Sequence, residues 1–229
     1  MTIIMYLQGG LALTLQVLLL QAMLRNAGRR YILLTLYICS LFLSTVMELS
    51  IRVSSSGRWT STAKQYYFAS EIIQQVLVFA TILGFIYQQL GRGETRVRVS
   101  RWLIPAAILA ISLSVYFHQD ARLNFWFTSV SRDLSFFATL LNLMLWGSLL
   151  RDRNRDARLL MVSGALGIQL AGNATGQGLR LLVEWSRILL WMGNSVSSLT
   201  YLLSLYVLYR AFRKPEPVPW RDPVTVSAP

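Results

Sequence analysis

The sequence predicts an all-α integral membrane protein built as a bundle of seven transmembrane helices. Its 229 residues are 54% hydrophobic, with a mean hydropathy of +0.47. The apolar residues are gathered into runs of about 20, the length of helix that crosses ~30 Å of hydrocarbon at ~1.5 Å per residue. Seven such runs take up nearly the whole chain. We therefore expect one domain, residues 1–213, followed by a proline-rich, disordered cytoplasmic tail over residues 214–229.

The seven expected spans cover residues 3–24, 31–51, 66–90, 102–117, 134–150, 159–183 and 188–209. The fourth is short, but Trp102 and Tyr116 mark its ends as interfacial aromatic residues, and Pro105 lies in its first turn, where proline is tolerated. An aromatic segment, residues 124–130, precedes the fifth span. It forms either an interfacial helix or the first two turns of that span.

The basic residues predict the orientation of the bundle. Fifteen of the 22 Lys and Arg residues follow the first, third, fifth and seventh spans, and the other seven belong to the opposite side. Because cytoplasmic loops are enriched in Lys and Arg, we expect the N-terminus outside and the C-terminus in the cytoplasm of a multi-pass protein of the bacterial inner membrane. The net charge of +12 lies in short clusters between apolar runs, so we expect anionic lipids of the cytoplasmic leaflet as partners and no nucleic acid.

The segment 159–184 is the one around which we expect the bundle to be organised. At helical spacing it carries small residues on one side and polar ones on the other. The small side has Ser163, Gly164, Gly167 and Ala171, and the polar side has Gln169, Asn173, Gly176, Gln177, Arg180 and Glu184. Neither stripe suits contact with lipid, which predicts a position in the middle of the bundle. Gly172 and Gly176 form a single G-x-x-x-G pair, a weak indication of close helix packing within the chain.

A polar level near the outer ends of the helices is the predicted ligand site. Glu71 on the third span shares a helical face with Gln74 and Gln75, and Asn194 begins a similar polar stripe on the seventh. Ionisable groups in the apolar layer are costly unless paired, so the place where they gather is the default ligand site. The predicted ligand-binding residues are Glu71, Gln74, Gln75, Gln169, Asn173, Arg180, Glu184 and Asn194. The alternative is that these side chains only hold the helices together by hydrogen bonds.

Within this level we expect the carboxylate of Glu71 to meet the guanidinium of Arg180. The third span descends from the outside and the sixth rises towards it, so the two residues reach comparable depths on polar faces. The competing arrangement pairs Arg180 with Glu184, one turn along its own helix.

Several cofactors are excluded by the sequence. The only lysines, Lys64 and Lys214, lie in polar flanks, so a retinal Schiff base is not expected. With His118 as the only histidine, neither bis-histidine haem ligation nor an H-E-x-x-H zinc site is possible. Cys39, the only cysteine, allows neither a disulfide nor a thiolate metal site. No catalytic residue, metal or cofactor is therefore predicted, and a non-enzymatic protein is favoured.

One resemblance adds to this interpretation. The third span opens with YYFASE (Tyr66 to Glu71), and a basic loop follows from Arg92. With seven spans and an outer N-terminus, the chain resembles uncharacterised seven-helix membrane proteins of bacteria, particularly acidobacteria. The resemblance implies the fold and no activity. The layout is also similar to the seven-helix input domains of bacterial sensor proteins.

These features favour a sensor-like or receptor-like protein, or an accessory subunit, that binds a small ligand or a partner at its outer polar level. The alternative is a small transporter or channel with a pathway between the third, sixth and seventh spans. A third possibility is an architectural subunit of a larger assembly, with a second copy of the chain or another membrane protein as its partner. The ionisable groups gather at the outer end and only Gln, Asn, Ser and Gly lie deeper, which favours binding over transport.

Overall fold

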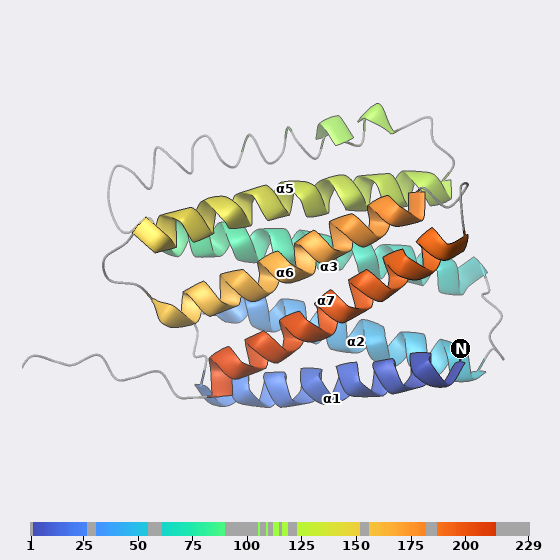
Figure 1. Cartoon of the computed structure of the whole chain (residues 1–229), viewed down its shortest axis with the longest axis horizontal. Coiled ribbons are helices and arrows are strands. Elements are labelled where there is room, and N and C mark those ends of the chain that lie inside the picture. Colours follow the sequence, from blue (N-terminus) through green and yellow to red (C-terminus); the bar gives the residue numbers. More distant parts are fainter. Residues whose placement is uncertain are drawn as a thin grey trace, which may run out of the picture.

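A computed structural model describes residues 2–26, 31–54, 61–89, 105, 109, 112–114, 116–118, 123–151, 156–181 and 187–213. These residues form six long helices: α1 (Thr2–Asn26), α2 (Ile32–Ser54), α3 (Ser61–Gln89), α5 (Leu123–Arg151), α6 (Ala157–Leu181) and α7 (Arg187–Arg213), which lie side by side in Figure 1. The described residues contain no strand, which confirms the all-α prediction.

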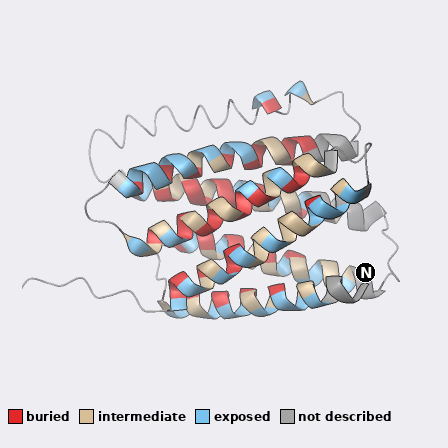
Figure 2. Ribbon diagram, viewed as in Figure 1, coloured by how far each residue is buried: buried red, intermediate tan, exposed pale blue. Residues whose placement is uncertain are grey.

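Four of the described helices are long and apolar enough to cross a membrane, over Leu7–Asn26, Ile32–Ile51, Ala69–Gln88 and Ser129–Leu150. Large apolar side chains are exposed along them, for example Leu11 on α1, Leu43 on α2 and Val76 on α3. Figure 2 shows exposed residues on the outward sides of the helices and buried ones where helices face each other. So much exposed apolar surface is unfavourable in water and suits a lipid environment. These features fit a membrane protein.

The six helices form a closed ring in chain order. α1 packs on α2, α2 on α3, α3 on α5, α5 on α6, α6 on α7, and α7 on α1. The helices α1, α3, α5 and α7 begin at the end of the bundle near Glu71, called here the Glu71 end. α2 and α6 begin at the opposite end, near Arg158, called the Arg158 end. α3 also contacts α6 across the ring.

The expectation that the sixth span lies in the middle of the bundle is wrong for this ring. α6 is one of its members, and Ala171 and Thr175 are exposed on its outward side. The physical reason is that a small residue such as Ala171 costs little at an apolar surface. The Thr175 hydroxyl is satisfied by its own helix, because Thr175 Oγ1 donates to the carbonyl of Ala171 at 2.8 Å.

The small residues of α6 bring it close to both neighbours. A Cβ on Gly167 would lie 2.7 Å from Nδ2 of Asn142 on α5. On the other side, a Cβ on Gly172 would collide with the side chain of Thr200 on α7. A Cβ on Gly176 would collide with Ser197 Oγ and come within 2.7 Å of the Gly193 carbonyl. The G-x-x-x-G pair therefore serves close packing of α6 on α7, as predicted.

The Arg158 end of the bundle is closed by aromatic side chains. The buried ring of Tyr31 meets those of Phe85 and Phe212 edge to face, with centroid distances of 5.9 and 5.1 Å. Asn26 Nδ2 donates to the Phe212 carbonyl at 2.9 Å, and Arg158 Nη1 donates to the Asn26 carbonyl at 3.1 Å. The guanidinium of Arg158 also lies over the Phe212 ring, 5.5 Å from its centroid. These contacts tie α1, α2, α3, α6 and α7 together at this end.

The structure settles the start of the fifth helix. α5 begins at Leu123, so residues 124–130 are its first turns rather than a separate interfacial helix. The polar residues near this start pack inward, since Ser129 and Ser131 are buried. Between α3 and α5 the described residues include Pro105, Leu109 and residues 112–114 and 116–117, all helical; the rest of the predicted fourth span and the tail 214–229 lie outside the described residues.

Candidate functional site

A buried polar cluster joins three helices near the Glu71 end. It consists of Glu71 and Gln75 on α3, Ser131 on α5 and Gln177 on α6, and is called here the Glu71 cluster. Ser131 Oγ donates to Glu71 Oε1 at 2.8 Å. Gln177 Nε2 lies within hydrogen-bond distance of both Glu71 Oε1 (3.1 Å) and Ser131 Oγ (3.0 Å), and Gln75 Nε2 is 3.4 Å from Ser131 Oγ. These contacts bring the polar face of the third span against the polar stripe of the sixth.

Helical geometry explains why these side chains meet. Glu71 and Gln75 are four residues apart on α3, so they lie one above the other on the same face. α3 and α5 run in the same direction, which places Ser131, near the start of α5, at the depth of Glu71. α6 runs the opposite way, so Gln177 near its end reaches the same level. Each helix contributes one polar face to a common point.

Two hydrogen-bond acceptor atoms of the cluster have no donor among the described residues. The side chains of Gln75, Ser131 and Gln177 are 8%, 6% and 5% exposed. Both amide nitrogens donate within the cluster. Gln75 Oε1 and Gln177 Oε1, however, accept no hydrogen bond from the described part of the chain. Nearly all buried polar atoms in native structures have a partner. An unmade bond at a buried oxygen costs about 1–3 kcal/mol, so two of them in one cluster need an explanation.

The cluster brings together groups that can bind a polar molecule. A carboxylate, a hydroxyl and two primary amides offer hydrogen-bond acceptors and donors in a site of low dielectric, where each bond is strong. No group of three His, Cys, Asp or Glu side chains that would hold a metal ion occurs among the described residues.

Three of the other predicted site residues, Gln74, Asn173 and Asn194, are described outside the cluster. Gln74 Nε2 donates to Ser44 Oγ on α2 at 2.8 Å. Asn173 is half-buried on α6, and Asn194 is exposed on α7. Arg180 belongs to α6, one turn beyond Gln177, but its side chain is outside what the structure describes, as is Glu184. The predicted pairing of Glu71 with Arg180 therefore stays a prediction.

Gln169 belongs to a separate polar contact deeper in the bundle. Its Nε2 donates to the Tyr37 hydroxyl at 2.6 Å, and Ser204 Oγ donates to its Oε1 at 3.2 Å. Both ends of this amide are bonded, which joins α6 to α2 and α7. Gln169 lies two turns from Gln177 on the same face of α6, so it serves as an internal comparison for an amide that holds helices together.

A further polar contact that sequence analysis missed links α1, α2 and α7. Gln16 is fully buried, and its Nε2 donates to the hydroxyls of Tyr201 and of Thr45, the latter at 3.1 Å. Gln16 is the amide nearest the middle of a predicted span that also contains Gln8 and Gln21. Its depth within the span is the signal that could have identified it, because an amide there must face a polar partner.

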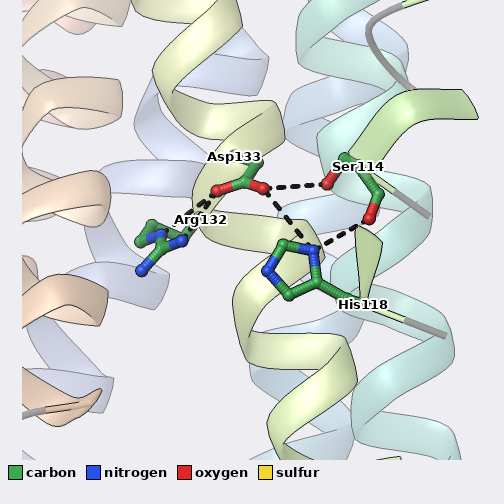
Figure 3. A network of polar contacts seen from close by, with 4 residues as sticks. All are labelled: Ser114, His118, Arg132 and Asp133. Atoms are coloured by element: carbon green, nitrogen blue, oxygen red, sulfur yellow. Dashed lines mark hydrogen bonds and ion pairs between the residues drawn. The ribbon is translucent and has the colours of Figure 1, made fainter. Parts of the chain in front are cut away.

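Asp133 organises a second group beside α5, shown in Figure 3. Ser114 Oγ donates to Asp133 Oδ2 at 3.0 Å, and Arg132 Nη2 donates to Oδ1 at 3.0 Å. His118 Nδ1 is 2.9 Å from the Ser114 carbonyl and 3.8 Å from Asp133 Oδ2. A hydrolytic triad needs the serine hydroxyl on a histidine nitrogen. Here the hydroxyl is on the aspartate, so the arrangement anchors residues 114 and 118 to α5 and does not activate Ser114.

Comparisons with known proteins gave no match of this chain to a family model, to a curated protein or to a solved structure. The resemblance to acidobacterial seven-helix proteins therefore stays a prediction.

Proposed function

We propose that this protein is a seven-span, non-enzymatic protein of the bacterial inner membrane, with its N-terminus outside, that binds a small polar ligand at the Glu71 cluster. In this proposal it acts as a receptor-like protein or as an accessory subunit of a membrane assembly. Its orientation follows from the distribution of Lys and Arg. The Glu71 end of the ring is then the outer end.

The observation that carries the proposal is the pair of amide oxygens on Gln75 and Gln177 that accept no bond from the described residues. They lie beside the Glu71 carboxylate at the junction of α3, α5 and α6. Hydrogen-bond donors of a small ligand would satisfy both oxygens and remove the cost of burying them. Gln169, an amide of the same helix that joins α6 to α2 and α7, is bonded at both ends.

The hydrogen bonds that polar side chains of α7 already make favour binding over the transporter or channel alternative. That alternative requires polar groups of α7 to line a pathway with α3 and α6. Tyr201 accepts a hydrogen bond from Gln16, and Ser204 donates one to Gln169. The Arg158 end is closed by the aromatic contacts of Tyr31. A ligand that enters at the Glu71 cluster therefore has no open path through the Arg158 end.

The test compares two isosteric variants of the same helix. Gln177→Met removes an amide of the Glu71 cluster, and Gln169→Met removes the fully bonded amide two turns away. The wild type and both variants are purified in mild detergent, and the small molecules that each releases on denaturation are identified by mass spectrometry. We expect one molecule to be released by the wild type and by Gln169→Met and to be missing from Gln177→Met. Release of the same molecule by both variants, or of none by the wild type, contradicts the proposal.

A further inference from the structure

The inner face of α5 is polar from the Glu71 cluster to the middle of the bundle. Ser131, Ser135 and Asn142 lie on this face and are 6%, 0% and 3% exposed. They are separated by one and then by two helical turns, so they line about 16 Å of the helix axis. Ala138, 1% exposed, lies between the last two. α5 therefore presents a row of small or polar side chains to α3 and α6.

Two polar atoms of this row lack a hydrogen-bond partner among the described residues. Ser135 Oγ and Asn142 Oδ1 have no hydrogen-bond partner in the described parts of the chain. Hydroxyls inside helices usually donate to a carbonyl one turn back. Thr139 on α5 does so, with its Oγ1 2.7 Å from the Ser135 carbonyl. Ser135 does not. Gln75 Oε1 and Gln177 Oε1 likewise have no partner among the described residues, so four such atoms lie on α3, α5 and α6.

Elsewhere in the bundle, comparable side chains are bonded to each other. Ser204 on α7 is as deeply buried as Ser135, and its Oγ donates to Gln169. Gln16 at the junction of α1, α2 and α7 leaves one oxygen, Oε1, without a partner among the described residues, but its nitrogen serves two hydroxyls. Of the buried glutamine, serine and asparagine side-chain atoms without a partner among the described residues, all but Gln16 Oε1 therefore belong to α3, α5 and α6.

The row of polar side chains ends where the inner face of α5 becomes apolar. Beyond Asn142, the inner face of α5 continues with Leu145 and Leu149, each 1% exposed. Both belong to the apolar core that also contains Tyr31 and Phe85. Asn142 itself is fixed at this boundary, because its Nδ2 donates to the Ser163 carbonyl of α6 at 2.8 Å. The polar side chains described on this face of α5 end at Asn142, and the residues described beyond it on the same face, Leu145 and Leu149, are apolar.

We infer that a blind, water-filled vestibule extends from the Glu71 cluster along the inner face of α5 to the depth of Asn142. Water supplies the missing hydrogen bonds of Ser135 and Asn142 when α5 separates slightly from α6, and the aromatic wall at the Arg158 end stops it. The inference rests on the proposed ligand site, which forms the mouth of the vestibule. The vestibule lets water enter the bundle along α5 rather than beside α7.

Cysteine accessibility tests this path, because a charged methanethiosulfonate reagent reacts only with a thiolate that water reaches. The native Cys39 is first replaced by Ala. Ser135→Cys and Asn142→Cys report on the path, and Ser131→Cys reports on its mouth. Ser204→Cys is the matched control, because Ser204 is also a fully buried serine. Ser204 bonds to Gln169, and Asn142 packs on Gly167, two residues before Gln169 on α6. Ser204 and Asn142 therefore lie at about the same depth. Ala138→Cys replaces Asn142→Cys if that variant does not fold.

In the purified protein in lipid nanodiscs, we expect Ser135→Cys and Asn142→Cys to react at least about tenfold faster than Ser204→Cys, because only a hydrated thiol ionises readily. If Ser131→Cys reacts but the deeper cysteines are as slow as the control, the vestibule is refuted and the ligand site at its mouth stands. If Ser131→Cys is also as slow as the control, both the vestibule and an accessible ligand site are refuted. Equally fast reaction at all four positions, including Ser204→Cys, also refutes a path confined to α5.

Discussion

The close approach of α6 and α7 predicts a large effect from the addition of a single methyl group. Gly172→Ala places a Cβ where the Thr200 side chain already lies, with both its Oγ1 and its Cβ inside van der Waals contact. Thr200 has little freedom to move, because its hydroxyl is bonded to the carbonyls of Val196 and Ser197 at 2.8 and 3.1 Å. The two helices must therefore separate.

The expected cost is at least the ~1–3 kcal/mol typical of an overpacked core. In a protein of this size each kcal/mol corresponds to about 2–4 °C of melting temperature. Gly172→Ala should then lower the melting temperature in detergent by about 2–12 °C. Gly178→Ala is the control in the same helix: a Cβ there meets nothing within 4 Å. This variant should be neutral or stabilising by up to ~1 kcal/mol, because Ala favours a helix over Gly.

A double variant that moves the glycine from α6 to α7 tests whether the collision with Thr200 causes the loss of stability. Thr200→Gly combined with Gly172→Ala removes the three atoms that lie nearest the new Cβ. The double variant should be more stable than the sum of the two single changes predicts. Equal melting temperatures for Gly172→Ala and Gly178→Ala, or strictly additive effects in the double variant, would refute the packing of α6 on α7 described here.

Three further predictions concern α6 and the topology. Gly167→Leu should push Asn142 and α5 away and cost at least ~1–3 kcal/mol of thermal stability in detergent; an unchanged melting temperature would mean that this side of α6 faces lipid. In a double-mutant cycle, Glu71→Gln and Arg180→Gln should be non-additive, with the double variant more stable than the single losses predict, because each single change leaves a charge without its partner; additive losses would leave Arg180 paired only along its own helix. Cysteines introduced at Arg96 and Arg155 should be protected from an impermeant thiol reagent added outside intact cells, whereas one at Arg58 should react; labelling of the first two would reverse the orientation.

Helical periodicity predicted which faces of the helices are polar, and the structure agrees for the third and sixth spans. Glu71, Gln75 and Gln177 were placed on interior faces, and they meet. The same periodicity does not say which helix lies opposite a given face. Gln74 and Gln75 are adjacent in sequence, yet one bonds to α2 and the other to α5. That choice depends on how the ring closes, which is a property of the whole bundle.

Ser131 was not predicted because of its surroundings in the sequence. It is followed by Arg132 and Asp133, which favoured an interfacial position and a later start of the span. In the structure, Arg132 donates to Asp133, which also accepts a hydrogen bond from Ser114, while Ser131 points into the bundle. A local pairing of this kind is invisible to a hydropathy pattern, which left open whether the helix starts at Leu134 or includes residues 124–130; in the structure it starts at Leu123.

The most direct test of the Glu71 cluster as a ligand site is a high-resolution density map of the purified protein in lipid, with a rigid antibody fragment to aid alignment. The account predicts non-protein density within hydrogen-bond distance of both Gln75 Oε1 and Gln177 Oε1, between α3, α5 and α6, and its loss in Gln177→Met. A map in which both amide oxygens accept hydrogen bonds from protein groups, with no density between them, would contradict it and leave the cluster a contact that holds the three helices together.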